Sequence, residues 1–413
     1  MSFRRPKGGR ISNTSTWMSS RFFASLRMTL YDYMQTLTTL LPASAGILFF
    51  IQSYYQLGLY RKLYLHSKKE KKETDTPPLS VILVAKDAAS DLQKNLPAIL
   101  EQDYPEFEVI VIYEQSGDDN CEDVLKLLKD KYPHLHHSFI PDSARYISHK
   151  KLGITMGIKA SHHDWLVFTE PNCAPTSNQW LRKLARNFTQ DTDIVLGYSN
   201  YEKTKGWFNR KITFDTLLNS MRYLGSAIGG HPYMGCGRNL AYRKSLYYAQ
   251  KGFSSHLNLQ RGEDDLFINQ TANKKNTRVE LSPESIVRIT APHFSKDWSE
   301  EKLSHNMTSR YFKGMSRYLM GFETSSRLLF FLAITACLAY GIWAQDWIMV
   351  GIASFLWLLR FIILLVVFRK TSLALNERKF YSTLFLFDWM QPLWNLRFKI
   401  QQRAIRKAEF MRK

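Results

Sequence analysis

Apolar and polar residues alternate with two distinct periods along the middle of the chain. Short apolar runs rich in β-branched residues predict strands, and longer segments with apolar residues three or four positions apart predict helices. The predicted strands cover residues 79–85, 107–113, 137–140, 165–169 and 193–197, and the predicted helices cover residues 88–102, 122–132, 148–160 and 178–188. Strands that alternate with helices are typical of an α/β layer fold. We therefore expect one α/β domain over residues 79–323.

Three longer apolar segments flank this domain, at residues 33–60, 328–344 and 347–368. Because a bilayer crossing needs roughly 20 apolar residues, we interpret all three as transmembrane helices. Only Gln345 and Asp346 separate the last two segments, so these are predicted to form an antiparallel hairpin. Arg360 lies inside the third segment and must pair, reach the membrane surface or face protein.

The formal net charge of +20 is concentrated beside the apolar segments. Basic residues crowd the N-terminal segment at residues 1–32, the linker at residues 61–78 and an amphipathic tail at residues 369–413. Since basic flanks stay in the cytoplasm, we predict a multi-pass protein of the cell (inner) membrane, with the middle domain and the tail cytoplasmic. Contact with the lipid bilayer explains this charge better than nucleic acid, for which no recognition motif occurs.

The basic residues 1–32 do not fit this topology, because three spans would leave them outside. Either translation starts at Met28 or Met34, or the first apolar segment is a re-entrant or interfacial helix, and the sequence is compatible with both. That segment is too long and too far from the start for a cleaved signal peptide. Four scattered cysteines lack CxxC spacing, which argues against zinc and agrees with a reducing compartment.

Polar residues follow three of the predicted strands. Lys86-Asp87 follow the first strand, Glu114 follows the second, and Glu170-Pro171-Asn172 follow the strand at residues 165–169. Parallel sheets bind ligands beyond the carboxyl ends of their strands, so this edge is the candidate ligand site. Neither a P-loop nor a GxGxxG motif occurs, and an anionic ligand would need a metal or basic side chains.

Three consecutive carboxylates, Glu263-Asp264-Asp265, open an apolar run near the end of the domain. Repulsion between such close like charges raises one pKa, and a carboxylate held in this way can act as a base. The alternative is a helix start that carries acids only because the helix dipole favours them.

Six motifs in a fixed order make the chain resemble a membrane-bound inverting glycosyltransferase of family 2, of the bacterial type. The resemblance covers about residues 77–312, and the flanking membrane segments match the layout of such enzymes. The motifs are LSVILVAKD (79–87), QDYPEFEVIV (102–111), KK (150–151), DWLVFTEPNCAP (164–175), GRNLAY (237–242) and GEDDL (262–266). The resemblance implies the GT-A fold, a Rossmann-like mixed sheet that binds a nucleotide-sugar donor.

The resemblance also implies roles for individual residues. Asp264 matches the catalytic base that deprotonates an acceptor hydroxyl, and Glu263 stands beside it as the second catalytic residue. Glu170 and Asn172 fall where the family's Asp-x-Asp motif holds a divalent metal, manganese or magnesium, that stabilises the leaving diphosphate. The residues expected to bind the nucleotide are Lys86, Asp87, Glu114 and Lys151.

Two departures from the family's pattern refine this prediction. Only Glu170 of the two expected metal ligands is anionic, so metal affinity should be low unless the diphosphate supplies most of the binding. The Gln-x-x-Arg-Trp motif of processive members is absent. This favours transfer of a single sugar to a lipid-linked or cell-envelope glycan acceptor, in cell envelope polysaccharide biosynthesis. The alternative is a catalytically impaired member that binds a nucleotide sugar or glycan lipid as a scaffold.

Two further apolar segments have helical periods. Residues 207–230 form either a core helix or a surface that faces the acceptor. Residues 380–400 carry aromatic residues among basic ones, which suits a helix in the membrane interface, interrupted at Pro392.

Overall fold

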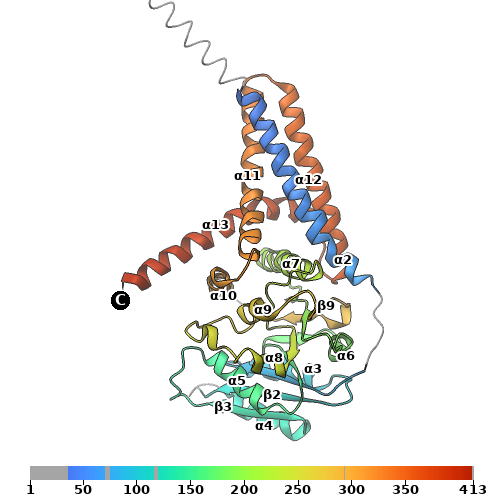
Figure 1. Cartoon of the computed structure of the whole chain (residues 1–413), viewed down its shortest axis with the longest axis vertical. Coiled ribbons are helices and arrows are strands. Elements are labelled where there is room, and N and C mark those ends of the chain that lie inside the picture. Colours follow the sequence, from blue (N-terminus) through green and yellow to red (C-terminus); the bar gives the residue numbers. More distant parts are fainter. Residues whose placement is uncertain (1–35, 70–74, 116–119, 293, 412–413) are drawn as a thin grey trace, which may run out of the picture. The chain divides into compact units, whose positions relative to one another are not determined.

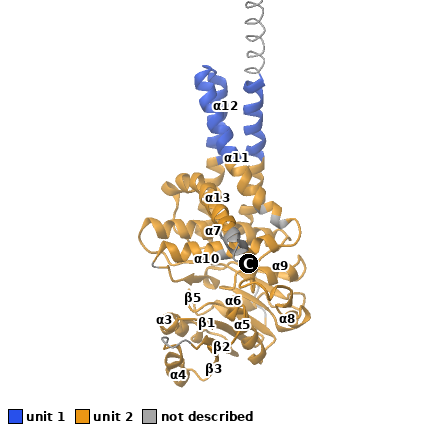
Figure 2. Cartoon of the chain, turned by 90° about the vertical axis from the view of Figure 1, so that its left-hand side faces the viewer, with its two compact units in different colours: residues 1–50, 329–360 blue, residues 51–328, 361–413 orange. Residues whose placement is uncertain are grey.

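The computed structural model describes residues 36–69, 75–115, 120–292 and 294–411 (Figure 1). The predicted basic segment at residues 1–32 lies outside these ranges. Two compact units make up the chain: residues 1–50 with 329–360, and residues 51–328 with 361–413 (Figure 2). The second unit holds the α/β domain.

A seven-stranded mixed sheet forms the centre of the second unit, in the order β3-β2-β1-β4-β8-β6-β9. The first four strands of this order are parallel, and β8 runs antiparallel to both of its neighbours. The strands are β1 (Leu79–Ala85), β2 (Phe107–Glu114), β3 (Leu135–Ile140), β4 (Trp165–Phe168), β6 (Ile194–Gly197), β8 (Leu240–Arg243) and β9 (Thr277–Glu280). The α/β fold and the five predicted strands are thus confirmed.

The sequence pattern missed five short strands. Besides β8 and β9, a second sheet has the order β5-β10-β7, formed by β5 (Cys173–Pro175), β10 (Val287–Ile289) and β7 (Ser199–Tyr201). Strands of three or four residues are too short to display a period of two.

Helices cover both faces of the large sheet, as the side chains of β1 show. Leu79, Val81 and Leu83 are buried on the side of α3 (Ala89–Leu100), α4 (Cys121–Lys131) and α6 (Trp180–Ala185). Ile82 and Val84 point the other way, because side chains alternate along a strand. They pack in the core that includes residues of α5 (His149–Ala160), α7 (Trp207–Ile228) and α9 (Asp265–Thr271).

Helix α5 packs unusually close to β1. A Cβ atom would lie 2.6 Å from Ile82 Cγ2 if added at Gly157, and 2.7 Å from Val84 Cγ1 if added at Gly153. Both positions therefore require glycine. This contact brings the first turn of α5 to the carboxyl end of β1, next to the expected ligand site.

Two further predictions concern α7 and α13 (Tyr381–Met411). Helix α7 is a core helix, with Phe214, Leu217 and Leu224 fully buried. Helix α13 runs beside α7 and α10 (Ser295–Thr308) (Figure 1). It continues through Pro392 instead of being interrupted there. A proline removes one backbone hydrogen bond, but Phe387, Gln391 and Phe398 around it are buried, and tertiary packing supplies most of the stability of such a helix.

Within the described residues, three helices have the length and apolar composition of membrane spans: Thr36–Ser67, Gly321–Trp343 within α11 (Ser316–Trp343), and α12 (Trp347–Ala374). They coincide with the three predicted apolar segments. In the smaller unit Arg360 faces protein, with its guanidinium 5.2 Å from the ring centres of both Phe330 and Phe331. The remaining helical segments are η1 (Tyr54–Tyr60), α2 (Arg61–Ser67), α8 (Lys244–Ala249), η2 (Ser254–His256), η3 (Pro283–Ser285) and η4 (Ser309–Tyr311).

A buried ionic cluster lies in the second unit around Glu323, which is fully buried. One of its oxygens accepts a hydrogen bond from Arg222 of α7 at 2.5 Å, and the other accepts from Tyr60 at 2.8 Å and from Arg327. The cluster therefore ties α11 to α7 and to the end of η1.

Candidate functional site

The acidic triplet forms a buried turn into α9. Glu263, Asp264 and Asp265 are only 4%, 6% and 3% exposed. Gly262, just before them, has φ +110°, and a Cβ there would lie 2.5 Å from Leu266 Cδ1. Only glycine accommodates this turn. Burial of three adjacent acids is costly without a use for them, which argues against mere decoration of a helix start.

Both oxygens of Asp264 are held by backbone amides. Oδ1 accepts a hydrogen bond from Asp265 N at 2.7 Å, and Oδ2 accepts one from Gly237 N at 2.8 Å. Position 237 also suits glycine, because a Cβ there would lie 3.3 Å from Asp264 Oδ2. The carboxylate is therefore fixed in one orientation.

Glu170 lies between two cations. Phe168 of β4 pairs with Leu240 of the antiparallel β8, so Glu170, two residues after Phe168, comes opposite Arg238. Arg238 Nε donates to Glu170 Oε2 at 2.7 Å, and Lys150 Nζ donates to Oε1 at 2.6 Å. Burial alone would raise the pKa of the Glu170 carboxyl, but the charges of Lys150 and Arg238 hold it well below its usual range.

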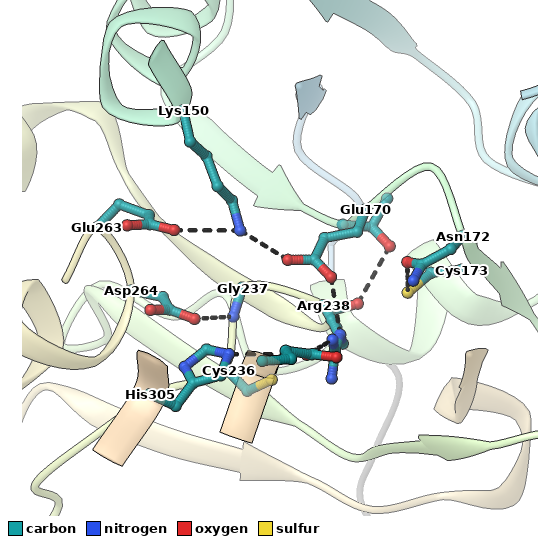
Figure 3. A network of polar contacts seen from close by, with 12 residues as sticks. Lys150, Glu170, Asn172, Cys173, Cys236, Gly237, Arg238, Glu263, Asp264 and His305 are labelled. Carbon is teal, nitrogen blue, oxygen red and sulfur yellow. Dashed lines mark hydrogen bonds and ion pairs between the residues drawn. The ribbon is translucent and has the colours of Figure 1, made fainter. Parts of the chain in front are cut away.

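These contacts belong to a longer network (Figure 3). Lys150 Nζ also lies 3.1 Å from Glu263 Oε1, and Arg238 Nη2 donates to Glu301 of α10. His305 Nε2 in turn lies 3.8 Å from Glu301 Oε1. Acidic and basic groups thus alternate through the site, in the order Glu263, Lys150, Glu170, Arg238, Glu301, His305.

The predicted nucleotide-binding residues Lys86 and Glu114 lie together. The parallel register pairs Ala85 with Tyr113, so the next residue of each strand stands side by side. Lys86 Nζ is 2.9 Å from Glu114 Oε2, and His149 Nδ1 is 3.2 Å from the same oxygen. Asp87 follows in the left-handed region, with φ +47°. His149, which the sequence did not single out, directly precedes Lys150.

Lys151 lies outside the charged network. It is 1% exposed, and its ammonium donates to the carbonyl oxygens of His256 and Leu259, both at 2.6 Å. Burial lowers the pKa of Lys151 to about 8. Lys151 therefore supports the loop before Gly262, and Lys150 is the lysine that faces the acids. Nucleotide binding by Lys151 stays a prediction, and the geometry favours Lys150 in that role.

The predicted metal ligands offer few available oxygens. Among the described residues, no group of three or more His, Cys, Asp or Glu side chains is arranged to hold a metal ion. Both oxygens of Glu170 accept from cations, and Asn172 Oδ1 lies 3.4 Å from Cys173 Sγ. Glu263 Oε2, however, is buried without a hydrogen-bond partner. Because magnesium-type sites often use one or two carboxylates plus substrate phosphates, these residues fit a metal that shares the oxygens of a bound diphosphate.

A cavity of about 520 Å³ opens on one side of Asp264. Helices α7, α10 and α13 contribute to its lining, together with Asp264, Asp265, Arg238 and Arg310. On another side, a space of about 20 Å³ is bordered by Asp264, Lys150, Glu170 and Glu263. The larger volume is in the range of small-molecule sites, and the smaller one has room for about one water. Asp264 borders both spaces.

Asp265 adds a titratable group to the cavity wall. Its Oδ1 accepts from Leu266 N at 2.7 Å, and its Oδ2 accepts from Thr308 Oγ1. Burial, together with the charge of Asp264, raises the pKa of the Asp265 carboxyl from 3.8 to about 7. Below pH 4 the Asp265 carboxyl is neutral in both the folded and the unfolded protein, and its burial carries no charge penalty. This stability is lost as the pH rises through 7, the pKa of the folded protein.

The variant Asp265→Asn tests this pKa, because asparagine stays neutral at every pH. From pH 5 to pH 8 the stability of the variant relative to the wild type should rise by about 2.6 kcal/mol, because only the wild type acquires the buried charge that folding penalises. Thermal unfolding of both proteins at the two pH values measures the difference. A stability difference that does not change with pH would mean that Asp265 is ionised throughout.

A model of glycosyl transferase family 21 matches residues 45–398 of this chain. Comparison with curated proteins gave no match. Among solved structures, the chain is similar to the mannosyltransferase PcManGT from Pyrobaculum calidifontis in complex with GDP-Man and Mn²⁺. That similarity has a TM-score of 0.53 and 16% identity, and it covers 86% of this chain and 99% of that one.

Two structures of S. aureus TarS are also similar, both with a TM-score of 0.40. TarS 1–349 is 18% identical, with 60% of this chain and 69% of that chain covered. TarS 1–349 in complex with UDP-GlcNAc is 16% identical, with 60% and 71% covered. The predicted glycosyltransferase and its GT-A domain with flanking membrane-length helices are confirmed, and the matching family is 21, where the motifs suggested family 2.

Proposed function

The chain belongs to glycosyl transferase family 21, and we propose that it transfers a single sugar, with inversion, from a nucleoside-diphosphate sugar to a membrane-bound acceptor. The acceptor is a lipid-linked or cell-envelope glycan at the cytoplasmic face of the cell membrane. One observation carries this proposal: the fixed carboxylate of Asp264 stands between the Lys150–Glu170 pair and a cavity large enough for an acceptor.

Asp264 is proposed as the general base. Its two backbone hydrogen bonds hold the carboxylate toward the cavity wall, where an acceptor hydroxyl would lie within hydrogen-bond reach. As the hydroxyl oxygen forms its bond to the anomeric carbon, the proton passes to Asp264. The bond from that carbon to the diphosphate oxygen breaks, and the nucleoside diphosphate leaves from the opposite face. Attack opposite the leaving group inverts the configuration.

The strand-end residues hold the donor in this proposal. Glu170 and Asn172, together with diphosphate oxygens, would hold a manganese or magnesium ion, which would offset the charge of the leaving group. Lys86 and Glu114, already paired at the ends of β1 and β2, lie where the nucleoside would rest. Asp87 directly follows Lys86 in the sequence, and His149 lies 3.2 Å from Glu114. Both residues contribute to the nucleoside site in this proposal.

Helix α13 supports an acceptor that arrives from the membrane. Its cavity-lining residues are Asn395, Lys399 and Gln402. A different stripe of the same helix is apolar and exposed, with residues spaced three or four apart: Leu386, Trp389, Leu393, Leu396 and Ile400. An amphipathic helix of this kind lies in a membrane interface with its apolar face in lipid. The acceptor cavity would then open close to the lipid headgroups.

The experiment that tests this function uses the full chain in lipid nanodiscs. The protein is incubated with a panel of nucleotide sugars and a membrane lipid extract, and product glycolipids are analysed by mass spectrometry and NMR. We expect one donor to be consumed and the product to have inverted anomeric configuration. A product with retained configuration would rule out the single displacement. Donor binding without any turnover would support the scaffold alternative instead.

Glu170→Gln provides a second test, directed at the donor site. The substitution removes the only anionic residue of the metal pair, so manganese-dependent nucleotide binding should weaken by about tenfold or more. Calorimetric titration with nucleoside diphosphates, with and without Mn²⁺, measures this effect. If chelators leave the wild-type enzyme fully active, the proposed metal role is wrong.

A further inference from the structure

Each cation that holds Glu170 also has a second carboxylate within reach. Lys150 Nζ lies 2.6 Å from Glu170 Oε1 and 3.1 Å from Glu263 Oε1. Arg238 donates from Nε to Glu170 and from Nη2 to Glu301. The other oxygen of Glu263 is buried and has no hydrogen-bond partner. A buried oxygen without a hydrogen-bond partner is costly, and it belongs to the carboxylate whose other oxygen already lies 3.1 Å from Lys150 Nζ.

The formal charge of the network creates a need for an additional cation. The network itself holds three acids (Glu170, Glu263 and Glu301) and two bases (Lys150 and Arg238). The carboxylate of Asp264 borders the same space, so the formal charge there is −2, or −1 with a protonated His305. A diphosphate that enters this site would meet net repulsion unless positive charge arrives with it. A metal ion can supply that charge, but Glu170 has no oxygen available while both cations hold it.

We propose that Lys150 and Arg238 are placeholders for the metal, and that they leave Glu170 when a divalent cation and the diphosphate bind. Lys150 then donates only to Glu263, which has a second oxygen without a hydrogen-bond partner, and Arg238 donates only to Glu301. Glu263 and Glu301 are therefore positioning residues that keep the displaced cations paired. This exchange rests on the proposed function, because it concerns the donor site of the same transfer.

The exchange explains why each placeholder sits between two acids. A buried cation that lost its only partner would remain unpaired, at a cost of several kcal/mol. Here neither cation is left unpaired: Glu170 loses two hydrogen bonds and gains the metal, while Lys150 keeps Glu263 and Arg238 keeps Glu301. Lys150 suits this movement, since its ammonium is carried on a flexible stem with three donors.

Lys150→Met is the direct test, with Mn²⁺ alone as the probe. The full chain in detergent is titrated with Mn²⁺, and the electron paramagnetic resonance signal of the free ion reports binding. Because the variant lacks the competing ammonium, its affinity for Mn²⁺ should rise by about tenfold or more. The matched control is Lys94→Met, which removes the same charge from an exposed pair with Glu202 and should leave the affinity unchanged.

Glu263→Gln tests the receiving side and keeps the proposal testable if Lys150→Met does not fold. Without the charged carboxylate of Glu263, Lys150 remains paired with Glu170, so the affinity for Mn²⁺ should fall by about tenfold. It should fall more than in Asp264→Asn, which removes the same charge without removing a receiver. In the double variant Lys150→Met/Glu263→Gln, most of that loss should disappear, because no lysine remains to be displaced.

Unchanged or weaker Mn²⁺ binding by Lys150→Met would overturn the exchange, as would equal losses in Glu263→Gln and Asp264→Asn. All of these measurements record metal binding without turnover. Their outcome is therefore independent of the product analysis, which decides the proposed function separately.

Discussion

Asp264→Asn is expected to lower the rate of sugar transfer by about 10²- to 10⁴-fold, the usual contribution of a general base. Asparagine has nearly the same shape and can keep one of the hydrogen bonds from Gly237 N and Asp265 N, but its amide nitrogen cannot accept the other. The amide cannot take up the hydroxyl proton. Nucleotide affinity should stay within a few fold of the wild type, because the strand-end residues are unchanged.

The measurement combines two readouts on the same preparation: turnover of the active nucleotide sugar, and binding of its nucleoside diphosphate by calorimetry. Asp164→Asn is the matched control, because Asp164 is an exposed aspartate at the opposite end of β4, where it pairs with Arg243. That variant should keep full turnover. If Asp264→Asn also keeps it, another group must be the base.

Glu323→Gln is expected to destabilise the protein by about 3–5 kcal/mol, the usual cost of breaking a buried ion pair by removing one partner. Glu323 accepts hydrogen bonds from Arg222, Arg327 and Tyr60. After the substitution both arginines remain buried near a neutral amide, with less compensation for their charges. Because Arg222 lines the cavity of about 520 Å³ beside Asp264, a loss of activity at temperatures below unfolding would accompany the loss of stability.

Thermal unfolding in detergent, followed by tryptophan fluorescence, measures the effect. Glu300→Gln is the control, since it breaks an exposed pair with Lys296 within α10 and should leave the unfolding temperature unchanged. Equal unfolding temperatures for Glu323→Gln and the wild type would show that the cluster contributes no net stability. In that case well-packed neutral groups could replace it without loss.

The ligand edge of the sheet was predictable because its signals are local. Strands such as residues 79–85 are buried on both faces of the sheet, so they appear in the sequence as continuous apolar segments. Because the strands are parallel, the polar residues at their carboxyl ends lie along the same edge of the sheet. Lys86 and Glu114 lie side by side for this reason. The acids at residues 263–265 stood out because three adjacent charges are rare before an apolar run.

The partners of those acids were not predictable in the same way. Arg238 reaches Glu170 only through the antiparallel pairing of β4 with β8, a strand of four residues that has no readable period. Glu301 and His305 come from α10, far along the chain. The motif at residues 237–242 was the one feature of the sequence that pointed to Arg238, and it did not indicate which carboxylate the arginine would pair with.

The choice between Lys150 and Lys151 shows most clearly where sequence reasoning ends. Successive residues of a helix point about 100° apart, so one of the two lysines faces the acids and the other faces the loop at residues 256–259. The rotation of α5 decides which, and Gly153 and Gly157 set that rotation by seating the helix against β1.

The sequence by itself determined the α/β domain, the three apolar segments of membrane length and the acids of the site, because these depend on periodicity, segment length and the kinds of residues present. Only the tertiary structure decided that Glu170 is held by Lys150 and Arg238 and that Asp264 borders the cavity. The two contacts of Glu170 join residues 20 and 68 positions apart, and the lining of the cavity runs from Ser199 to Gln402. The energy of a charge depends on the groups that folding brings within a few ångströms of it.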